Sequence, residues 1–283
     1  MFRVPHYMLC VDVQKEIKPE PGARTSQHFL YPQTIGTETL MDQKQTYNLT
    51  LKIHRFDPET ERAGIQVYQF EAGRILRFVD LFRKLNDTQD PTLAWSSSCE
   101  HGQCGTCSVI INGKPLLACE LLVENAVHEF NTTTFEIKPL NIAPVIRDLV
   151  IDTTEAYKRV DRVKPYIIQP IDFHSGGKVY SISPQVLERY VNATRCINCF
   201  CCSAACISSH NKFLGPNAML STIVRVMDPR ELEKQERLKI LYSDQGIYRC
   251  HSSQACSFVC PKEINVADFI AMAKEGRITK NEA

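Results

Sequence analysis

Residues 196–206 read CINCFCCSAAC and contain the cysteine spacing C-x2-C-x2-C-x3-C. This spacing is typical of a run whose thiolates hold a 4Fe-4S cluster. In chains with two such clusters, the fourth cysteine of each run binds the cluster of the other run, so a second run is expected downstream. It lies at residues 250–260, CHSSQACSFVC, where position 253 is a serine in the register of a cysteine. Together the two runs predict a domain built around two clusters.

Exchanging the fourth ligands between the runs gives two ligand sets. One is a full 4Fe-4S set, Cys196, Cys199, Cys202 and Cys260, and the other holds only Cys206, Cys250 and Cys256. Because a serine hydroxyl is a far poorer ligand for iron than a thiolate, the three-cysteine set predicts a 3Fe-4S cluster. The alternative is a fourth iron bound by Ser253. Cys10 and Cys201 are left over, and we interpret Cys201 as a buried filler beside the cluster.

A further group of cysteines precedes these runs. Residues 99–107 read CEHGQCGTC, with the spacing C-x4-C-x2-C, and another cysteine follows after a predicted hairpin. This is the plant-type arrangement for a 2Fe-2S cluster, with the ligands Cys99, Cys104, Cys107 and Cys119. We expect Gly102 and Gly105 to let backbone amides approach the cluster. The alternative is a four-cysteine zinc site, although structural zinc ligands usually come as two short pairs separated by a longer arm.

Hydrophobic patterns place this first group among strands. Alternating apolar residues predict strands at 47–53, 65–70 and 135–137, and the first two are expected to pair. Apolar residues at helical spacing predict an amphipathic helix at 74–86. The dipeptide Asn112-Gly113 favours a tight turn, which predicts a hairpin over residues 108–119.

From about residue 145 the strand patterns stop and helices are expected. Ser183 and Pro184 have the residue types of an N-cap and a first turn. Further helices are predicted at 216–227, 230–242 and 266–274, the last with Asn265 as cap and Gly276 as terminator. The predicted fold class is α+β, with three parts: an arm at 1–46, a plant-type 2Fe-2S ferredoxin-like (β-grasp) domain at 47–148, and an all-α, bacterial-ferredoxin-like (helical ferredoxin) domain at 149–283.

Composition argues against several classes of function. The chain has 33 Lys and Arg against 32 Asp and Glu, so we expect no basic surface for nucleic acid. We find no run of the roughly 18 apolar residues that a membrane-spanning helix requires, and the acidic residues within 1–27 are unlike an export signal. The sequence has no G-x-G-x-x-G fingerprint, so any flavin is expected on a partner chain.

The order of the three cysteine patterns resembles the iron-sulfur subunit of succinate dehydrogenase and quinol:fumarate reductase over residues 47–275. Shorter stretches share the likeness: RCINC at 195–199, FLGP at 213–216, YRCH at 248–251 and CPK at 260–262. The resemblance implies a subunit that relays single electrons between a flavoprotein subunit, which carries FAD and the succinate chemistry, and a quinone at a membrane-anchor subunit. It also implies a peripheral membrane location on the cytoplasmic side of the inner membrane, or on the matrix side in a mitochondrion.

Within this resemblance, His251 matches a histidine of the quinone pocket beside the 3Fe-4S cluster. An alternative role for His251 is that of a hydrogen-bond donor that steadies the cluster loop. Residues 207–211, ISSHN, lack the tryptophan that many relatives have near the quinone. The alternative function is an iron-sulfur relay for another flavoprotein, such as a glycerol-phosphate, glycolate or thiol-dependent oxidoreductase. A non-redox zinc scaffold is the third hypothesis.

Overall fold

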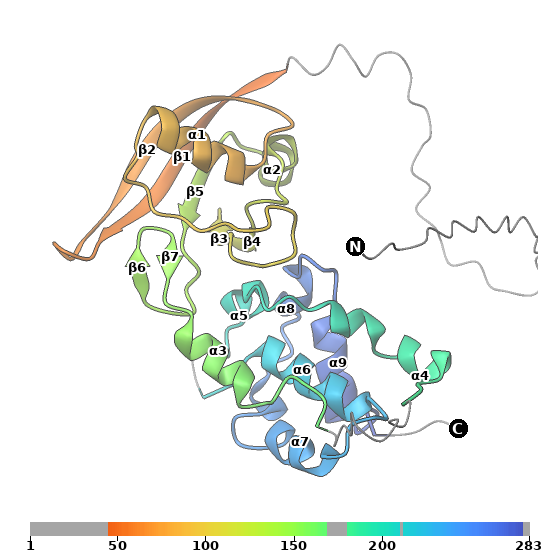
Figure 1. Ribbon diagram of the computed structural model, residues 1–283. Coiled ribbons are helices and arrows are strands. Elements are labelled where there is room, and N and C mark those ends of the chain that lie inside the picture. Colours follow the sequence, from red (N-terminus) through yellow and green to blue (C-terminus); the bar gives the residue numbers. More distant parts are fainter. Residues whose placement is uncertain (1–44, 169–179, 210–211, 280–283) are drawn as a thin grey trace, which may run out of the picture. The chain divides into compact units, whose positions relative to one another are not determined.

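The computed structural model describes residues 45–168, 180–209 and 212–279 (Figure 1). The predicted arm, residues 1–46, lies outside the described residues except for Gln45 and Thr46, and Cys10 lies outside them as well. The first part of the described chain is built mainly from strands and the second mainly from helices. This arrangement confirms the predicted α+β class.

A five-stranded sheet with the strand order β2-β1-β5-β3-β4 carries the first cysteine group. Its strands are β1 Thr46–Asp57, β2 Arg62–Gly73, β3 Ser108–Ile111, β4 Lys114–Leu117 and β5 Thr134–Lys138. β1 pairs antiparallel with β2, with Leu51 opposite Tyr68, and it pairs in parallel with β5. The alternating residues Leu49, Leu51 and Ile53 are all buried. The predicted pairing of the first two strands is thus confirmed.

The turn between β3 and β4 has the predicted chemistry. Asn112 and Gly113 both have positive φ angles, 46° and 84°, as a two-residue hairpin turn of the primed type requires. The side chain of Asn112 also reaches β5, where its Oδ1 accepts the N–H of Glu136 at 2.8 Å. The hairpin is therefore anchored to the centre of the sheet as well as closed by its turn.

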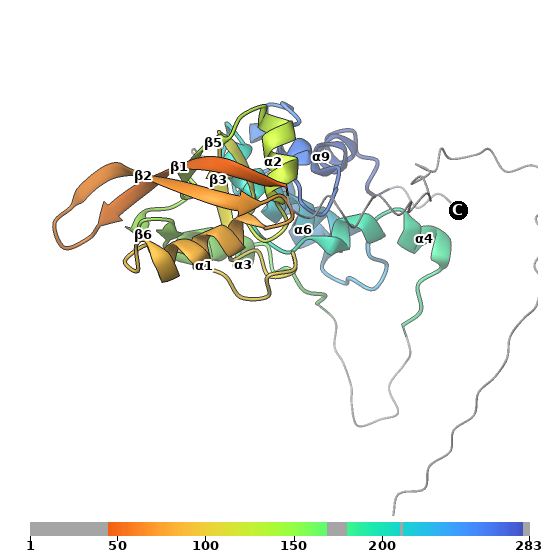
Figure 2. The same ribbon diagram turned by 90° about the horizontal axis from the view of Figure 1, so that it is seen from above.

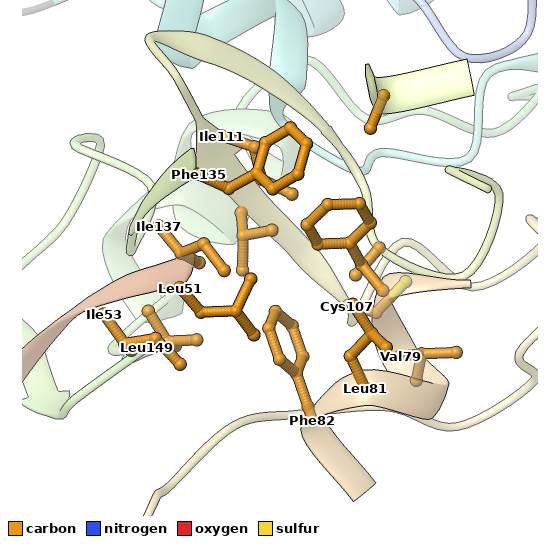
Figure 3. Packing of buried hydrophobic residues seen from close by; sticks show 14 of the residues in the cluster. Leu51, Ile53, Val79, Leu81, Phe82, Cys107, Ile111, Phe135, Ile137 and Leu149 are labelled. Atoms are coloured by element: carbon orange, nitrogen blue, oxygen red, sulfur yellow. The ribbon is translucent and has the colours of Figure 1, made fainter. Parts of the chain in front are cut away.

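Helix α1, Phe78–Thr88, packs on the sheet through one apolar face. The ring of Phe78 meets the ring of Phe135 on β5 edge to face, with centroids 5.1 Å apart. Figure 3 shows Phe82 of the same helix directed toward Leu51 on β1. This aromatic packing fixes α1 across the sheet and places its first turn beside the first cysteine group.

Two elements of the first half depart from the expectation. Helix α1 begins at Phe78 instead of residue 74, because Arg77 is extended and forms an isolated β-bridge with Leu122. Helix α2, Val123–Phe130, was not predicted. Its apolar residues Val123, Ala126, Val127 and Phe130 do stand at helical spacing, but the helix is only 8 residues long, so the pattern covers barely two turns.

The strands do not end near residue 145 as expected. β6, Val145–Arg147, and β7, Val150–Ile151, form a separate antiparallel pair. Elements of two and three residues are too short to show alternation, which is why the sequence pattern missed them. The pair spans the predicted domain boundary between 148 and 149, and that boundary stays a prediction.

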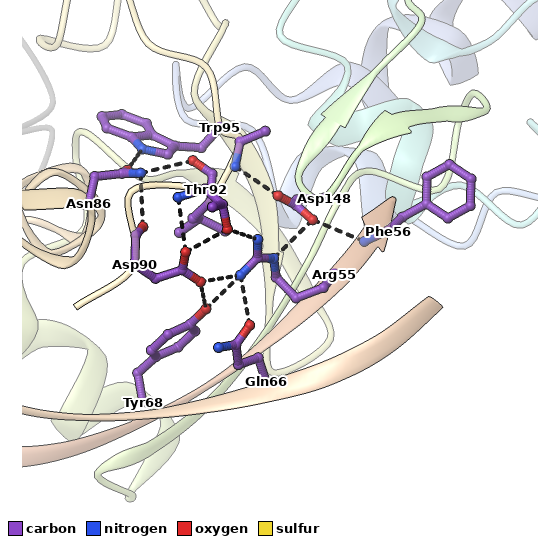
Figure 4. A network of polar contacts seen from close by, with 11 residues as sticks. Arg55, Phe56, Gln66, Tyr68, Asn86, Asp90, Thr92, Trp95 and Asp148 are labelled. Atoms are coloured by element: carbon purple, nitrogen blue, oxygen red, sulfur yellow. Dashed lines mark hydrogen bonds and ion pairs between the residues drawn. The ribbon is translucent and has the colours of Figure 1, made fainter. Parts of the chain in front are cut away.

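Arg55 of β1 links segments that are far apart in the sequence (Figure 4). Its Nε donates to Oδ1 of Asp148 at 2.9 Å, and its Nη1 donates to Oη of Tyr68 at 2.7 Å and forms an ion pair with Asp90. Asp148 also accepts the N–H of Ala94 at 2.8 Å. These contacts fix the segment that leads from α1 into the first cysteine group.

The second half is built from short helices. They are α3 Thr154–Asp161, α4 Pro184–Glu188, α5 Cys201–Ala205, α6 Pro216–Met227, α7 Lys234–Leu241, α8 Ala255–Phe258 and α9 Val266–Lys274, with 3-10 turns at Val191–Arg195 and Ile247–Arg249. Helix α6 packs against α7 and α9 (Figures 1 and 2). The bounds predicted for α6 and α9 are confirmed, and Ser183 caps α4 by accepting the N–H of Val186 at 3.4 Å.

Helix α7 starts at Lys234, four residues later than predicted. Side-chain carboxylates hold the preceding backbone in turns: Asp228 accepts the N–H of Arg230 at 3.0 Å, and Glu231 accepts the N–H of Glu233 at 2.9 Å. Such local bonds compete with the helical hydrogen-bond pattern, so the helix begins only after them.

The cap of α9 also differs from the expectation. Asn265 occupies the N-cap position, but its side chain makes no capping hydrogen bond. The cap comes from α8, where Oγ of Ser257 accepts the N–H of Ala267 at 2.9 Å and donates to Oδ1 of Asn265 at 2.8 Å. The helix that carries Cys256 is thereby tied to the start of α9.

Arg237 of α7 forms a buried ion pair and also binds the backbone that follows α3. Arg237 and Glu231 pair at 2.7 Å, and their side chains are only 2% and 0% exposed. Nη1 of Arg237 also donates to the carbonyl groups of Val163 and Lys164, each at 2.7 Å. One guanidinium therefore satisfies several backbone groups that lie far from it in the sequence.

Candidate cluster-binding sites

The loop of the first cysteine group turns its backbone amides toward the sulfur atoms. The N–H of Gln103 lies 3.2 Å from Sγ of Cys99, and the N–H of Gly102 lies 3.3 Å from Sγ of Cys119. The N–H groups of His101 and Gln103 lower the pKa of Cys99 to about 7. Because amides aimed at sulfur stabilise the thiolates that bind iron, the loop fits a 2Fe-2S cluster.

The four thiols of this group differ in exposure. Cys107 and Cys119 are 4% and 3% exposed, whereas Cys99 and Cys104 are half-buried. Burial raises the pKa of Cys107 to about 12, and Figure 3 shows this cysteine beside Val79 at the edge of the core. The site therefore has one side in the core and another that is open to a partner.

Two arginines hold the same loop in place at Glu100. Its backbone carbonyl accepts Nη1 of Arg77 at 2.7 Å, and its carboxylate accepts Oγ of Ser97 at 2.9 Å and forms an ion pair with Arg83. The residue has a positive φ angle of 56°, a conformation that side-chain-bearing residues hold only where surrounding contacts impose it. Sequence reasoning missed these contacts because both arginines lie in or beside α1, far from the loop in the sequence.

The second set comes together around a cavity in the helical half. Four of its lining residues are Cys196, Cys199, Cys202 and Cys260. Burial raises the pKa of Cys196 to about 11, and the charges of Cys199 and Cys260 contribute to this rise. Cys260 thus lies with the earlier run although it belongs to the later one, and the exchange of fourth ligands has a geometric counterpart.

The third set has the complementary arrangement. Burial raises the pKa of Cys256 to about 11, and its neighbours Cys250 and Cys206 add to this rise through their charges. Ser253, which has the register of a ligand, is exposed. Within the described residues, no group of three or more His, Cys, Asp or Glu side chains is arranged to hold a single metal ion.

The loop after Cys250 is held by a lysine from α9. Nζ of Lys274 donates to the carbonyl of Cys250 at 2.8 Å and to Oγ of Ser252 at 3.0 Å. The N–H of Ser252 lies 3.4 Å from Sγ of Cys250. His251, the predicted quinone residue, is exposed on this loop. The contact of Lys274 was not predicted, since only the folded chain brings α9 beside the loop.

Cys201 is fully buried, as its interpretation as a filler requires. It does not lie in the helical core, however. Cys199 and Cys201 belong to the apolar core of the first half, together with Val109 and Ile111 of β3 and Leu117 of β4. The centre of the run at 196–206 is therefore embedded in the core of the sheet domain.

Two family descriptions match this chain. A 2Fe-2S iron-sulfur cluster binding domain matches residues 50–158, and a 4Fe-4S dicluster domain matches residues 192–264. The mitochondrial succinate dehydrogenase [ubiquinone] iron-sulfur subunit of Candida glabrata is 31% identical over 232 residues, which cover 80% of this chain and 90% of that protein.

Solved structures show the same likeness. A chain of the Mycobacterium smegmatis Sdh1 complex in the apo form superposes with a TM-score of 0.71 at 26% identity, covering 84% of this chain and 99% of that one. A hypothetical protein from Helicobacter pylori shares the fold, with a TM-score of 0.52 at 18% identity over 81% of this chain and 39% of its own. Among the described residues, no helix combines the length and the apolar character that crossing a membrane requires.

Proposed function

The chain belongs to the family of succinate dehydrogenase iron-sulfur subunits, and we propose that its three cysteine sets relay single electrons between the FAD of a flavoprotein subunit and a quinone at a membrane anchor. It is an electron-transfer component of an oxidoreductase complex, whose succinate chemistry takes place on the flavoprotein chain. The observation that carries this proposal is the presence of three separate thiol sets, in order, along one chain.

The assignment of ligands is part of the proposal. The 2Fe-2S cluster is held by Cys99, Cys104, Cys107 and Cys119, the 4Fe-4S cluster by Cys196, Cys199, Cys202 and Cys260, and the 3Fe-4S cluster by Cys206, Cys250 and Cys256. Three observations support it: amides that point at sulfur in the first loop, a cavity lined by the second set, and mutual electrostatic contact within the third. The exposed Ser253 hydroxyl leaves the third cluster without a fourth iron.

When bound, such clusters accept and release one electron at a time, which links a two-electron flavin to a distant quinone. The residues of this chain hold the clusters and set their surroundings. Half-buried Cys99 and Cys104 leave the first site open toward the flavoprotein, whereas burial of Cys199 and Cys202 keeps water away from the second site. The fold thus gives the relay an open end and an insulated middle.

The other end of the relay is proposed to lie at the loop that contains His251. This residue is exposed next to Cys250, and Lys274 holds the backbone on either side of it. An exposed imidazole beside a cluster ligand is positioned to donate a hydrogen bond to a quinone carbonyl at an anchor subunit. The subunit would then be a peripheral membrane protein on the cytoplasmic side of the inner membrane, or on the matrix side in a mitochondrion.

Metal analysis of the complex purified without oxygen tests the proposal. We expect about nine irons per chain, the sum of the three cluster types, and an electron paramagnetic resonance (EPR) signal of an oxidised 3Fe-4S cluster. About ten irons without that signal would show that Ser253 or another group completes the third cluster. Zinc in place of iron would contradict the relay altogether. Succinate-dependent quinone reduction by the same preparation then connects the clusters to the family reaction.

A further inference from the structure

The loops of the first and second thiol sets touch at a glycine. We expected Gly102 and Gly105 to let backbone amides approach the first cluster, and the structure shows a further feature, because the backbone of Gly105 packs against Cys199. A Cβ atom built on Gly105 would lie 2.7 Å from Cα and 2.8 Å from Cβ of Cys199, closer than such atoms approach in proteins. Gly105 also has a positive φ angle of 74°. Only glycine lets the two loops come this close.

A serine and a buried thiol support this contact. Oγ of Ser108 donates to the carbonyl of Gly105 at 2.7 Å, and Sγ of Cys201 lies 3.7 Å from the same hydroxyl. Ser108 begins β3 and Cys201 begins α5, so this chain of contacts runs from the sheet to the helical run. Because Cys201 is fully buried in the core of the first half, the two loops are held together by packing as well as by hydrogen bonds.

The residue between Cys199 and Cys201 adds a third attachment. Phe200 has a positive φ angle of 62°, which is unfavourable for a residue with a side chain. Its ring is 5% exposed and meets the ring of Tyr157 edge to face, with centroids 5.0 Å apart. It also shares a buried cluster with Ile110 of β3. The strained backbone is thus maintained by packing of the ring between Tyr157 of α3 and Ile110 of the first half.

A hollow opens beside this contact. It has a volume of about 230 Å³, is lined by Gly105 and Cys199 themselves, and extends from Thr106 to Tyr157. The backbones of Gly105 and Cys199 therefore meet at the wall of this hollow.

We propose that the Gly105–Cys199 contact is the path by which an electron passes between the first and second cluster sites, with Ser108, Phe200 and Cys201 as positioning residues. This inference rests on the proposed relay function. The path transfers one electron, so that the donor site is oxidised and the acceptor site reduced by one electron. No bond forms or breaks and no proton moves. The rate of such transfer falls steeply when atoms along its path are pushed apart. The absence of a side chain at Gly105 therefore keeps the two cluster sites close enough for transfer.

Two glycine variants of the assembled complex test this proposal. Gly105→Ala forces the loops apart, whereas Gly113→Ala is the matched control, because Gly113 lies in the same domain, has a φ angle of 84° and has no atom within 4 Å of a built Cβ. Both variants carry the same backbone strain, but only the first creates the clash. Iron content and EPR spectra establish first that all three clusters are present in each.

Rapid mixing with succinate followed by freeze-quench EPR then separates the steps. In Gly105→Ala we expect the 2Fe-2S signal to appear at the wild-type rate and the 3Fe-4S signal to be reduced several-fold more slowly. Amide hydrogen exchange at residues 198–201 should become faster in this variant, because the packing that protects this segment is weakened. Gly113→Ala should match the wild type in both measurements.

If Gly105→Ala does not assemble, Ser108→Ala takes its place, because it removes the shorter of the two hydrogen bonds to the Gly105 carbonyl without adding an atom. Only the bond from the N–H of Ser108, at 3.3 Å, is then left. A slower 3Fe-4S reduction in that variant supports the path. A loaded variant, Gly105→Ala or failing that Ser108→Ala, whose 3Fe-4S reduction matches the wild type would overturn it. If succinate fails to reduce the 3Fe-4S site in the wild-type complex itself, the relay function is wrong, and that result is distinct from failure of the path.

Discussion

The half-exposed side of the first thiol set and the buried interior of the helical half shift the pKa of their cysteines in opposite directions. In the loop at 99–107, backbone amides, that of His101 foremost, lower the pKa of Cys99 to about 7. At Cys196 and Cys256 in the helical half, burial raises the pKa to about 11, as it raises the pKa of Cys107 to about 12 on the inner side of the first set. Cys199 departs from this pattern, because a hydrogen bond from the thiol of Cys201, above all, lowers its pKa. A half-exposed side stabilised by amides is suited to exchange electrons with a partner, whereas burial shields the thiols inside the chain from water.

The largest effect that tests this contrast is the loss of a whole cluster. We expect Cys260→Ala to remove the 4Fe-4S cluster and Cys206→Ala to remove the 3Fe-4S cluster, because each fourth ligand lies in the other run's set. EPR spectra and iron counts distinguish the two losses. Cys201→Ala is the control, since this thiol is more buried than that of Cys206 or Cys260 but lies outside both sets. Loss of the 4Fe-4S signal in Cys206→Ala would refute the exchange of ligands.

A gain of iron is the next largest effect. Ser253→Cys places a thiolate in the fourth register of the third site, and we expect a 4Fe-4S cluster there, one more iron per chain and a lower reduction potential. Redox titration followed by EPR should show the oxidised 3Fe-4S signal disappear. Ser252→Cys, one residue earlier and held by Lys274, should leave the three-iron spectrum in place. Identical spectra for Ser253→Cys and the wild type would show that the register is wrong.

Stability provides a smaller effect in the helical half. Arg237→Met removes one partner of a fully buried ion pair and leaves the carboxylate of Glu231 uncompensated. We expect a loss of about 3 to 5 kcal/mol in the free energy of unfolding. Urea titration of the cluster-loaded subunit measures it. Lys239→Ala in the same helix is the control, because Lys239 and Glu236 pair at the surface and such pairs contribute little. Equal midpoints for the two variants would contradict a structural role for the buried pair.

Much of this architecture is readable in the sequence where the determinant is local. Pro216 begins α6 as predicted, and Asn112-Gly113 turns the β3–β4 hairpin, because a helix start and a tight turn depend on a few adjacent residues. Cysteine spacing likewise predicted the three thiol sets, since each run supplies most of its own ligands. Long apolar periods and short turns are thus the features that a single sequence conveys.

The features that escaped prediction depend on contacts between distant segments. The cap of α9 comes from Ser257 on α8, and the contacts that hold Glu100 come from arginines in or beside α1. The burial of Cys201 in the sheet domain is of the same kind, because nothing near it in the sequence indicates which core it joins. Tertiary partners also explain the late start of α1, where Arg77 extends to bridge Leu122.

The smallest effect concerns the thiols of the first loop. It shows whether Cys99 and Cys107 differ in pKa before any cluster is bound. In the cluster-free chain, Cys99 should react with iodoacetamide increasingly as pH rises through about 7, because its lowered pKa produces thiolate there instead of near the ordinary value of about 8.5. Cys107 should stay unmodified at neutral pH, since burial raises its pKa to about 12. Mass spectrometry of the alkylated peptides measures both profiles, and the same chain in urea is the control, where the two cysteines should become alike. Matching profiles without urea would mean that the amides turn toward sulfur only after iron binds, so that the open site would be shaped by its cluster and not prepared for it.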